Sequence, residues 1–109
     1  GKVAVERGPL VYCAEAVDNQ NEPVLRAVMA KKPAFSLVDN YSIENTETKG
    51  APAFSVKAIK ADAQILEDGA NGVSVKNNVL TLIPYYAWNH RGANQMNVWF
   101  YQNLSVLDK

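Results

Sequence analysis

The chain has 109 residues, in which 11 Lys and Arg side chains balance 11 Asp and Glu side chains and hydrophobic residues make up 48% of the composition. This length fits one domain and is sufficient to bury a core without disulfides or metal ions. Zero net charge gives no long-range attraction to phosphate or anionic lipid, and no apolar run approaches the roughly 20 residues of a membrane span, so nucleic-acid and membrane partners are not expected.

The first 15 residues predict two short strands. Residues 3–5 and 10–15 alternate apolar and more polar side chains with the period of two that strands show. Gly8-Pro9 separates the two runs, because proline cannot donate a ladder hydrogen bond and glycine tolerates a bend. The polar run Asp18–Pro23 then predicts a surface loop.

The middle of the chain has weaker patterns. Residues 24–31 contain three apolar side chains at helical spacing, but Pro23 and Pro33 bracket the run tightly, so we expect a short strand or a turn rather than a helix. Residues 34–38 predict another strand. Residues 40–53 are polar and rich in turn-forming residues, which predicts a connection at one end of the domain.

Residues 54–65 predict a strand with an irregularity. Apolar side chains occupy even positions up to Ala58 and odd positions from Ile59 onward. A β-bulge at Ala58-Ile59 would keep both sets on one face of a sheet. The alternative is a helix over residues 58–67, which the composition permits, although no capping residue precedes it.

The C-terminal third predicts further strands. Residues 73–83 are expected to form a hairpin with its turn at Lys76-Asn77-Asn78, because asparagine adopts the positive φ of tight turns. A last strand is expected over residues 96–101, after a turn at residues 91–95. The chain therefore predicts one all-β domain over residues 1–109, an antiparallel β-sandwich or jelly roll of about seven or eight strands.

Cysteine and histidine each occur once, at Cys13 and His90. An intrachain disulfide is therefore excluded, and a zinc or copper site would have to be completed by carboxylates alone, so we predict neither a metal site nor a cofactor. Cys13 would be a nucleophile only if a neighbouring base lowered its pKa, and its apolar surroundings favour a buried strand cysteine. His90 is expected to be solvent-exposed or to hydrogen-bond in a turn.

Two carboxylates lie close together in the sequence, at Glu15 and Asp18. Paired carboxylates perform glycoside hydrolysis when they are about 5 to 10 Å apart. Acidic residues at the end of a strand and in the following loop are usually solvated, however, and we expect these two to be so.

Aromatic side chains are concentrated near the end of the chain. Planar rings at a sandwich edge stack against sugars or anchor protein interfaces. Strand parity would point Tyr85 and Tyr86 to opposite faces, so we favour core packing and docking on a neighbouring domain over sugar binding. The candidate residues for contact with a sugar or another domain are Tyr86, Trp88, His90, Arg91 and Trp99.

Three blocks of the sequence carry a resemblance to a known family. They are Arg7–Glu15, Leu82–Gly92 and Met96–Trp99, and together they resemble the C-terminal β-sandwich region of glycoside hydrolase family 127, the β-L-arabinofuranosidase-like enzymes. Their order and separation fit that region over essentially all 109 residues. The stretch between them contributes only a strand-like pattern.

The resemblance implies a piece excised from the C-terminal end of a larger glycosidase. Enzymes of that family have an (α/α) barrel with a cysteine nucleophile, a glutamate acid/base and a zinc site, followed by β-sandwich domains. None of those barrel motifs occurs here, and no catalytic residue, Cys13 included, is carried over. The implied role is a non-catalytic accessory domain whose partner is the catalytic barrel domain; the alternative is a carbohydrate-binding module.

Several further expectations follow from the same resemblance. The domain would support the barrel or the dimerisation of a homodimeric parent, and it would expose an apolar patch on the order of a few hundred Å2 where the barrel packs. The resemblance points to the bacterial periplasm or the cell exterior for the parent. Residues 1–10 lack the basic start and apolar core of a signal peptide, so the sequence itself leaves localisation undetermined.

Overall fold

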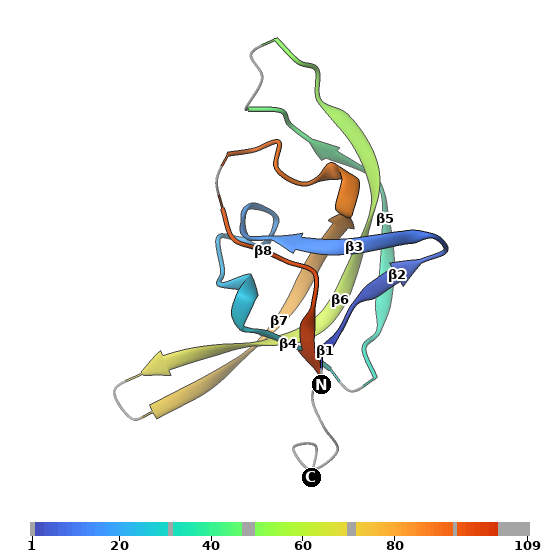
Figure 1. The fold of residues 1–109 in the computed structure, drawn as a ribbon. Coiled ribbons are helices and arrows are strands. Elements are labelled where there is room, and N and C mark those ends of the chain that lie inside the picture. The colour runs from blue at the N-terminus through green and yellow to red at the C-terminus, as the bar shows by residue number, and fades with distance from the viewer. Residues whose placement is uncertain (1, 31, 47–49, 70–71, 93, 103–109) are drawn as a thin grey trace.

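The computed structural model describes residues 2–30, 32–46, 50–69, 72–92 and 94–102. Within these ranges the chain forms nine strands and three short 3-10 helices, none of them long and apolar enough to cross a membrane (Figure 1). The all-β prediction is confirmed, with nine strands in place of seven or eight. The elements are β1 (Lys2–Val3), β2 (Val5–Arg7), β3 (Leu10–Glu15), η1 (Ala16–Asn19), η2 (Val24–Arg26), β4 (Ala27–Met29), β5 (Phe35–Ile43), β6 (Phe54–Gly69), β7 (Gly72–Pro84), η3 (Tyr85–Ala87), β8 (Met96–Asn97) and β9 (Phe100–Gln102).

The strands form one hydrogen-bonded path in the order β1-β9-β4-β6-β7-β3-β2, while β5 pairs with β6 and β8 pairs with β3. Every pair is antiparallel except β4 with β9. β1 and β2 stand at opposite ends of the path, yet only Ala4 separates them in sequence. The sheet therefore curls until its two ends meet, and Figure 1 shows β3 crossing in front of β6.

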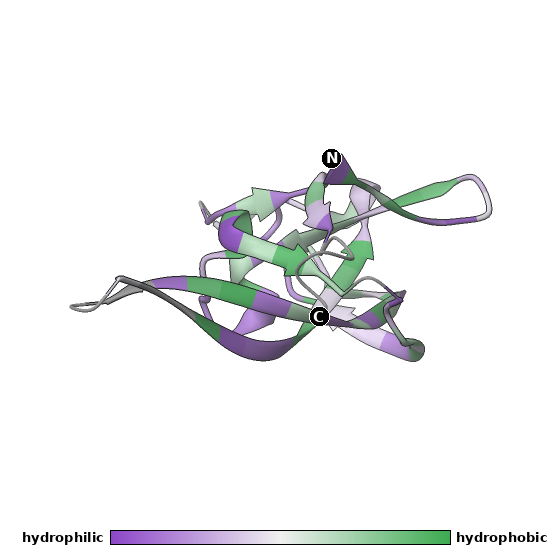
Figure 2. Ribbon diagram, turned by 90° about the horizontal axis from the view of Figure 1, so that it is seen from below, coloured by the Kyte–Doolittle hydropathy of each residue, from purple (hydrophilic) through white to green (hydrophobic). Residues whose placement is uncertain are grey.

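The central strands bury different side chains on their two faces, as period-two alternation requires. In β3, Tyr12 faces one apolar cluster and Cys13 faces another; in β7, Leu82 and Ile83 divide in the same way. Figure 2 shows the resulting changes between polar and apolar residues along the strands. The larger cluster, here the inner cluster, takes residues from both ends of the path and lies inside the curl; the smaller one, the outer cluster, is formed by Cys13, Ile43, Val56, Ala58, Ile83 and Ala87.

The two clusters explain the change of apolar parity at Ala58-Ile59. Even positions of β6 up to Ala58 contribute to the outer cluster, and odd positions from Ile59 contribute to the inner one, so no bulge is needed there. Pairing with β7 is unbroken along residues 59–69. The predicted bulge position and the helical alternative are both wrong. The register shift lies instead in β5, between Val38 and Tyr41, where Asn40 has a φ of +57°.

The predicted turn at Lys76-Asn77-Asn78 is also wrong, because these residues lie inside β7. The strand pairs with β6 throughout this region, and Gln64 Nε2 donates to Asn77 Oδ1 at 3.2 Å across the pair. The hairpin instead closes between Gly69 and Gly72, and Gly72 has a φ of +105° that suits glycine. Residues 70–71 lie outside the described residues.

Most of the other predicted elements are confirmed. The strands on either side of Gly8-Pro9 form a hairpin, with Gly8 at a φ of +58°, and residues 24–29 form η2 and β4. The strand predicted over residues 34–38 continues to Ile43, so the predicted connection over 40–53 starts too early. The last predicted strand is split into β8 and β9 by Val98 and Trp99.

Candidate functional site

Three charged side chains from distant parts of the sequence meet beside η1. Glu15 is the last residue of β3, Asp18 lies in η1, and Arg91 comes from the segment between η3 and β8. That segment returns to β3 because β8 pairs with its end and Ala16 N donates to Gln95 O at 2.9 Å. The fold thus brings together groups that are 73 to 76 positions apart.

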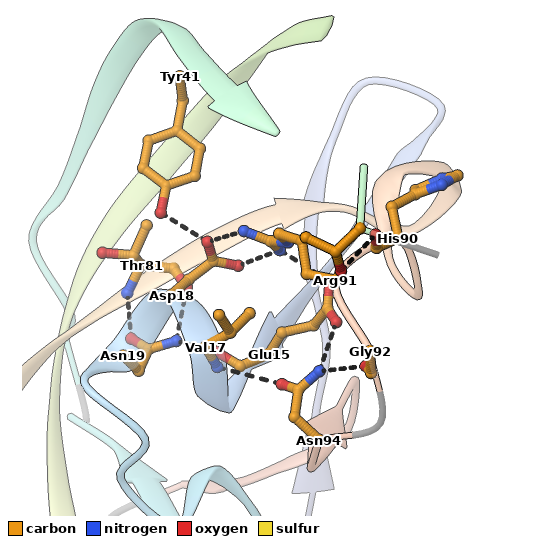
Figure 3. Close-up of polar contacts among 11 residues, drawn as sticks. Glu15, Val17, Asp18, Asn19, Tyr41, Thr81, His90, Arg91, Gly92 and Asn94 are labelled. Atoms are coloured by element: carbon orange, nitrogen blue, oxygen red, sulfur yellow. Dashed lines mark hydrogen bonds and ion pairs between the residues drawn. The ribbon is translucent and has the colours of Figure 1, made fainter. Parts of the chain in front are cut away.

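The guanidinium of Arg91 holds both carboxylates. Its Nη1 and Nη2 donate to Asp18 Oδ1 and Oδ2 at 2.5 and 2.7 Å, and Nη2 also donates to Glu15 Oε1 at 2.8 Å (Figure 3). The side chains of Arg91, Glu15 and Asp18 are only 9%, 0% and 1% exposed. A two-pronged contact of this kind matches the planar fork of arginine to a carboxylate.

Neutral side chains complete the contacts of the two carboxylates. Tyr41 OH donates to Asp18 Oδ1 at 2.6 Å, and Asn94 Nδ2 donates to Glu15 Oε2 at 3.0 Å (Figure 3). All four carboxylate oxygens of Glu15 and Asp18 therefore accept a hydrogen bond. Among the described residues, the buried Nε of Arg91 has no acceptor. We call Glu15, Asp18, Tyr41, Arg91 and Asn94 the buried network.

The contacts of the buried network shift the pKa values of its donors. Burial would lower the pKa of Arg91, but its hydrogen bonds to Asp18 and Glu15 outweigh this and raise it. Burial, followed by the hydrogen bond to Asp18, raises the pKa of Tyr41 to about 12. Both groups therefore keep their protons at neutral pH, arginine as a cation and tyrosine as a neutral phenol.

Asn19 ties η1 to the sheet next to this network. Its Nδ2 donates to Glu15 O at 2.8 Å and to Thr81 O at 3.0 Å, and Thr81 N donates to Asn19 Oδ1 at 2.7 Å. Asn19 is 4% exposed. Its amide thus satisfies buried backbone groups of β3 and β7 that would otherwise lack partners.

The structure corrects the interpretation of Glu15 and Asp18. The expectation that both are solvated is wrong, because Arg91 arrives from the other end of the chain and compensates their charge. The proximity of Glu15 and Asp18 in the sequence is the only signal that pointed to them. Arg91 was predicted only as a residue that contacts a sugar or another domain. The remaining members, Tyr41 and Asn94, were missed, since nothing local in the sequence marks them.

Cys13 and His90 offer no reactive centre among the described residues. Cys13 is 0% exposed, as predicted for a buried strand cysteine, and burial together with the nearby charges of Glu15 and Asp18 raises the pKa of its thiol to about 12. His90 packs edge-on against Phe54 with ring centroids 5.3 Å apart. In the part of the chain that the structure describes, no three His, Cys, Asp or Glu side chains group as metal ligands.

The five predicted contact residues have different surroundings. Tyr86 and Trp99 are 63% and 59% exposed. Trp88 packs against the outer cluster, His90 is half-buried, and Arg91 lies in the buried network. Tyr86 belongs to the 3-10 turn η3 and not to a strand, so the parity argument that separated it from its neighbouring tyrosine does not apply.

Comparison with known proteins identifies relatives of the whole domain. The sequence model of the glycoside hydrolase family 127 C-terminal domain matches residues 1–101. A non-reducing end β-L-arabinofuranosidase of Bifidobacterium longum subsp. longum is 34% identical over 102 residues, which cover 90% of this chain and 15% of the relative.

Solved structures agree with this match. A β-arabinofuranosidase of family 127 shares 40% identity with a TM-score of 0.77, covering 94% of this chain and 15% of the other. A family 127 β-L-arabinofuranosidase from Geobacillus stearothermophilus T6 shares 25% identity with a TM-score of 0.72, covering 94% of this chain and 16% of the other. The chain therefore spans only a small part of these relatives. The resemblance seen in the sequence is confirmed, and the chain belongs to the family of glycoside hydrolase family 127 C-terminal domains.

Proposed function

We propose that this chain is a non-catalytic accessory domain of a β-L-arabinofuranosidase-like glycoside hydrolase, where it supports the catalytic domain of the parent chain or the contact between two copies of that parent. The observation that carries the proposal is the state of Glu15 and Asp18. Both carboxylates are bound to one guanidinium and are covered by protein. Most glycosidases act through two carboxyl groups that reach the substrate, and this carboxylate pair is covered by protein.

Two ionisable side chains close to Glu15 and Asp18 are consistent with this proposal. The raised pKa values of Cys13 and Tyr41, both about 12, keep the thiol and the phenol protonated near neutral pH. Neither group is therefore poised as a nucleophile or as a general base. In this proposal the role of the buried network is structural: it fixes the segment before β8 to the end of β3 and to η1.

The test uses the full-length parent enzyme with Glu15→Gln or Asp18→Asn. We expect a lower melting temperature, because each change weakens a buried contact, and an unchanged kcat per folded molecule on an aryl β-L-arabinofuranoside. Asp39→Asn, which alters an exposed carboxylate, is the control for charge alone. A fall in kcat of about 100-fold or more in an enzyme that melts normally would contradict the proposal, since that is the effect of losing a general acid or base.

The alternative from the sequence, a carbohydrate-binding module, has one observation in its favour. Tyr86 and Trp99 are both more than half exposed, and a ring that stacks on a sugar has to be accessible. A titration of the chain with arabinose-containing oligosaccharides tests it, read by tryptophan fluorescence and amide NMR shifts. Shifts confined to the surroundings of Trp88 and Trp99 would favour this alternative, and a silent spectrum at millimolar ligand would exclude it.

A further inference from the structure

A groove lies between the β1–β2 corner and β5 and is lined by none of the residues of the buried network. Its volume is about 530 Å3, within the range of roughly 300 to 1,000 Å3 that ligand-binding clefts occupy. Most of its lining is apolar and includes Val3, Val5, Phe35, Leu37 and Ile59, while Glu6 and Arg7 of β2 add charged side chains. We call this feature the β2–β5 groove.

The side chains of β5 in this groove are left open to solvent. Phe35 and Leu37 are 54% and 52% exposed. They alternate along one strand and so project to the same side of it. A single exposed apolar side chain is ordinary, but two neighbouring ones that line an apolar groove form a surface typical of an interaction site.

The backbone beside the groove is also open. Within the described residues, β2 pairs with β3 alone and β5 pairs with β6 alone. Each of the two strands that flank the groove therefore has one edge without a strand partner. Such edges are normally covered by another part of a protein, and an extended segment is the shape that fits between them.

The comparisons indicate what lies nearby in the parent. The chain matches a C-terminal domain and spans 15 to 16% of its relatives, so most of a parent of that length precedes it. The preceding polypeptide reaches this domain at β1, and Val3 of β1 lines the groove. Residues of β1, β2 and β5 line the same groove, so the point at which a preceding segment would join this domain lies beside the exposed apolar side chains of β5.

We propose that the β2–β5 groove is occupied by an extended segment with apolar side chains from the part of the parent chain that precedes this domain. The inference rests on the proposed accessory function and specifies its surface. It places the contact on Phe35 and Leu37, not on the aromatic residues Tyr86 and Trp99.

Site-resolved cysteine labelling of the full-length parent tests this placement. Leu37→Cys is compared with Leu25→Cys, a matched control in η2, because the two leucines are 52% and 53% exposed here and Leu25 does not line the groove. Phe35→Cys and Val75→Cys, both 54% exposed, form a second matched pair. The buried Cys13 serves as an internal unreactive reference.

We expect the two groove positions to react with a small thiol reagent about tenfold more slowly than their controls, because labelling must wait for the contact to open. Peptide mass spectrometry quantifies each site, and the melting temperature of each variant verifies folding. Equal labelling rates would overturn the proposed placement. Protection that disappears when the enzyme is diluted would also overturn it, since a second copy would then be the occupant.

These outcomes are separate from a failure of the accessory function. That function is overturned by lost kcat in the Glu15→Gln or Asp18→Asn parent, which does not involve the groove. Open groove positions with normal kcat would reject only the groove proposal.

Discussion

The buried network and the β2–β5 groove differ in how far this chain covers their side chains. In the network every carboxylate oxygen of Glu15 and Asp18 finds a donor within this chain. In the groove Phe35 and Leu37 remain more than half exposed. The difference teaches that the two buried carboxylates are satisfied by donors of this chain, whereas apolar side chains of β5 are not covered by it, and this contrast motivates both proposals.

The largest expected effect on stability comes from removing the arginine of the buried network. Arg91→Met leaves Glu15 and Asp18 buried without a counter-charge, and we expect the free energy of unfolding to fall by about 3–5 kcal/mol. Urea unfolding of the chain measures it. Lys57→Met removes an ion pair with Asp39, whose side chain is 71% exposed, and should lower the same quantity by only about 0–1 kcal/mol. Equal losses would show that the buried network is not special.

A smaller effect is expected at alkaline pH. The pKa of Tyr41 is about 12 in the fold, against an ordinary value of 10.0. Below pH 10 the phenol is neutral in both states and its contribution is fully present. Between about pH 10 and 12 the unfolded chain loses the proton and the folded one keeps it, so stability falls with rising pH.

In the Tyr41→Phe variant, the free energy of unfolding should therefore fall less between pH 9 and 11 than it does in the wild type. Part of the fall should remain, because the pKa of the Cys13 thiol is also raised, from 9.0 to about 12. Urea unfolding at the two pH values is the measurement. Tyr101→Phe changes an exposed phenol and serves as the control. Parallel pH dependences of the wild type and Tyr41→Phe would refute the assignment.

The smallest effect on stability is expected from a substitution in the β2–β5 groove. Leu37→Ala should change the free energy of unfolding of the chain alone by no more than about 0.5 kcal/mol, as for most exposed positions. Leu82→Ala, at a fully buried position of the inner cluster, should lower it by about 2–5 kcal/mol. If the two changes were similar, the groove would already be filled by this domain itself, and the contrast drawn above would fail.

Local sequence patterns predicted a strand well where the alternation of side chains continues without a change of parity. Residues 10–15 form β3 as expected, whereas the strand expected over residues 3–5 is divided by Ala4 into β1 and β2. The strand over residues 54–65 was also predicted correctly, but the bulge predicted within it was wrong because the two halves of β6 contribute to different clusters. A change of parity at Ala58-Ile59 has the same appearance in the sequence whether a bulge restores one face or a second core covers the other.

The Asn77-Asn78 pair shows a second limit. Asparagine favours turns locally, yet here both residues lie in a long hairpin whose register with β6 is set over many residues. Tertiary pairing outweighs a local preference of this size. The glycines at 69 and 72, which close the hairpin, carried the better turn signal.

The candidate site was less predictable than the fold. Glu15 and Asp18 were noticed, but their burial depends on a guanidinium 73 or more positions away. No local pattern encodes that distance. The apolar side chains of β5 were likewise visible in the sequence, but only the neighbouring β1–β2 corner makes them a groove.

The sequence by itself determined the class of this protein: period-two alternation and turn residues specify strands, and three blocks at the ends of the chain specify the family. The tertiary structure decided which strands became neighbours, and with that which charges were compensated and which apolar faces stayed open. The physical reason is the separation in the sequence over which each kind of interaction acts. Alternation and turn preference act between adjacent residues, whereas charge compensation and burial depend on groups that only the curled sheet brings together.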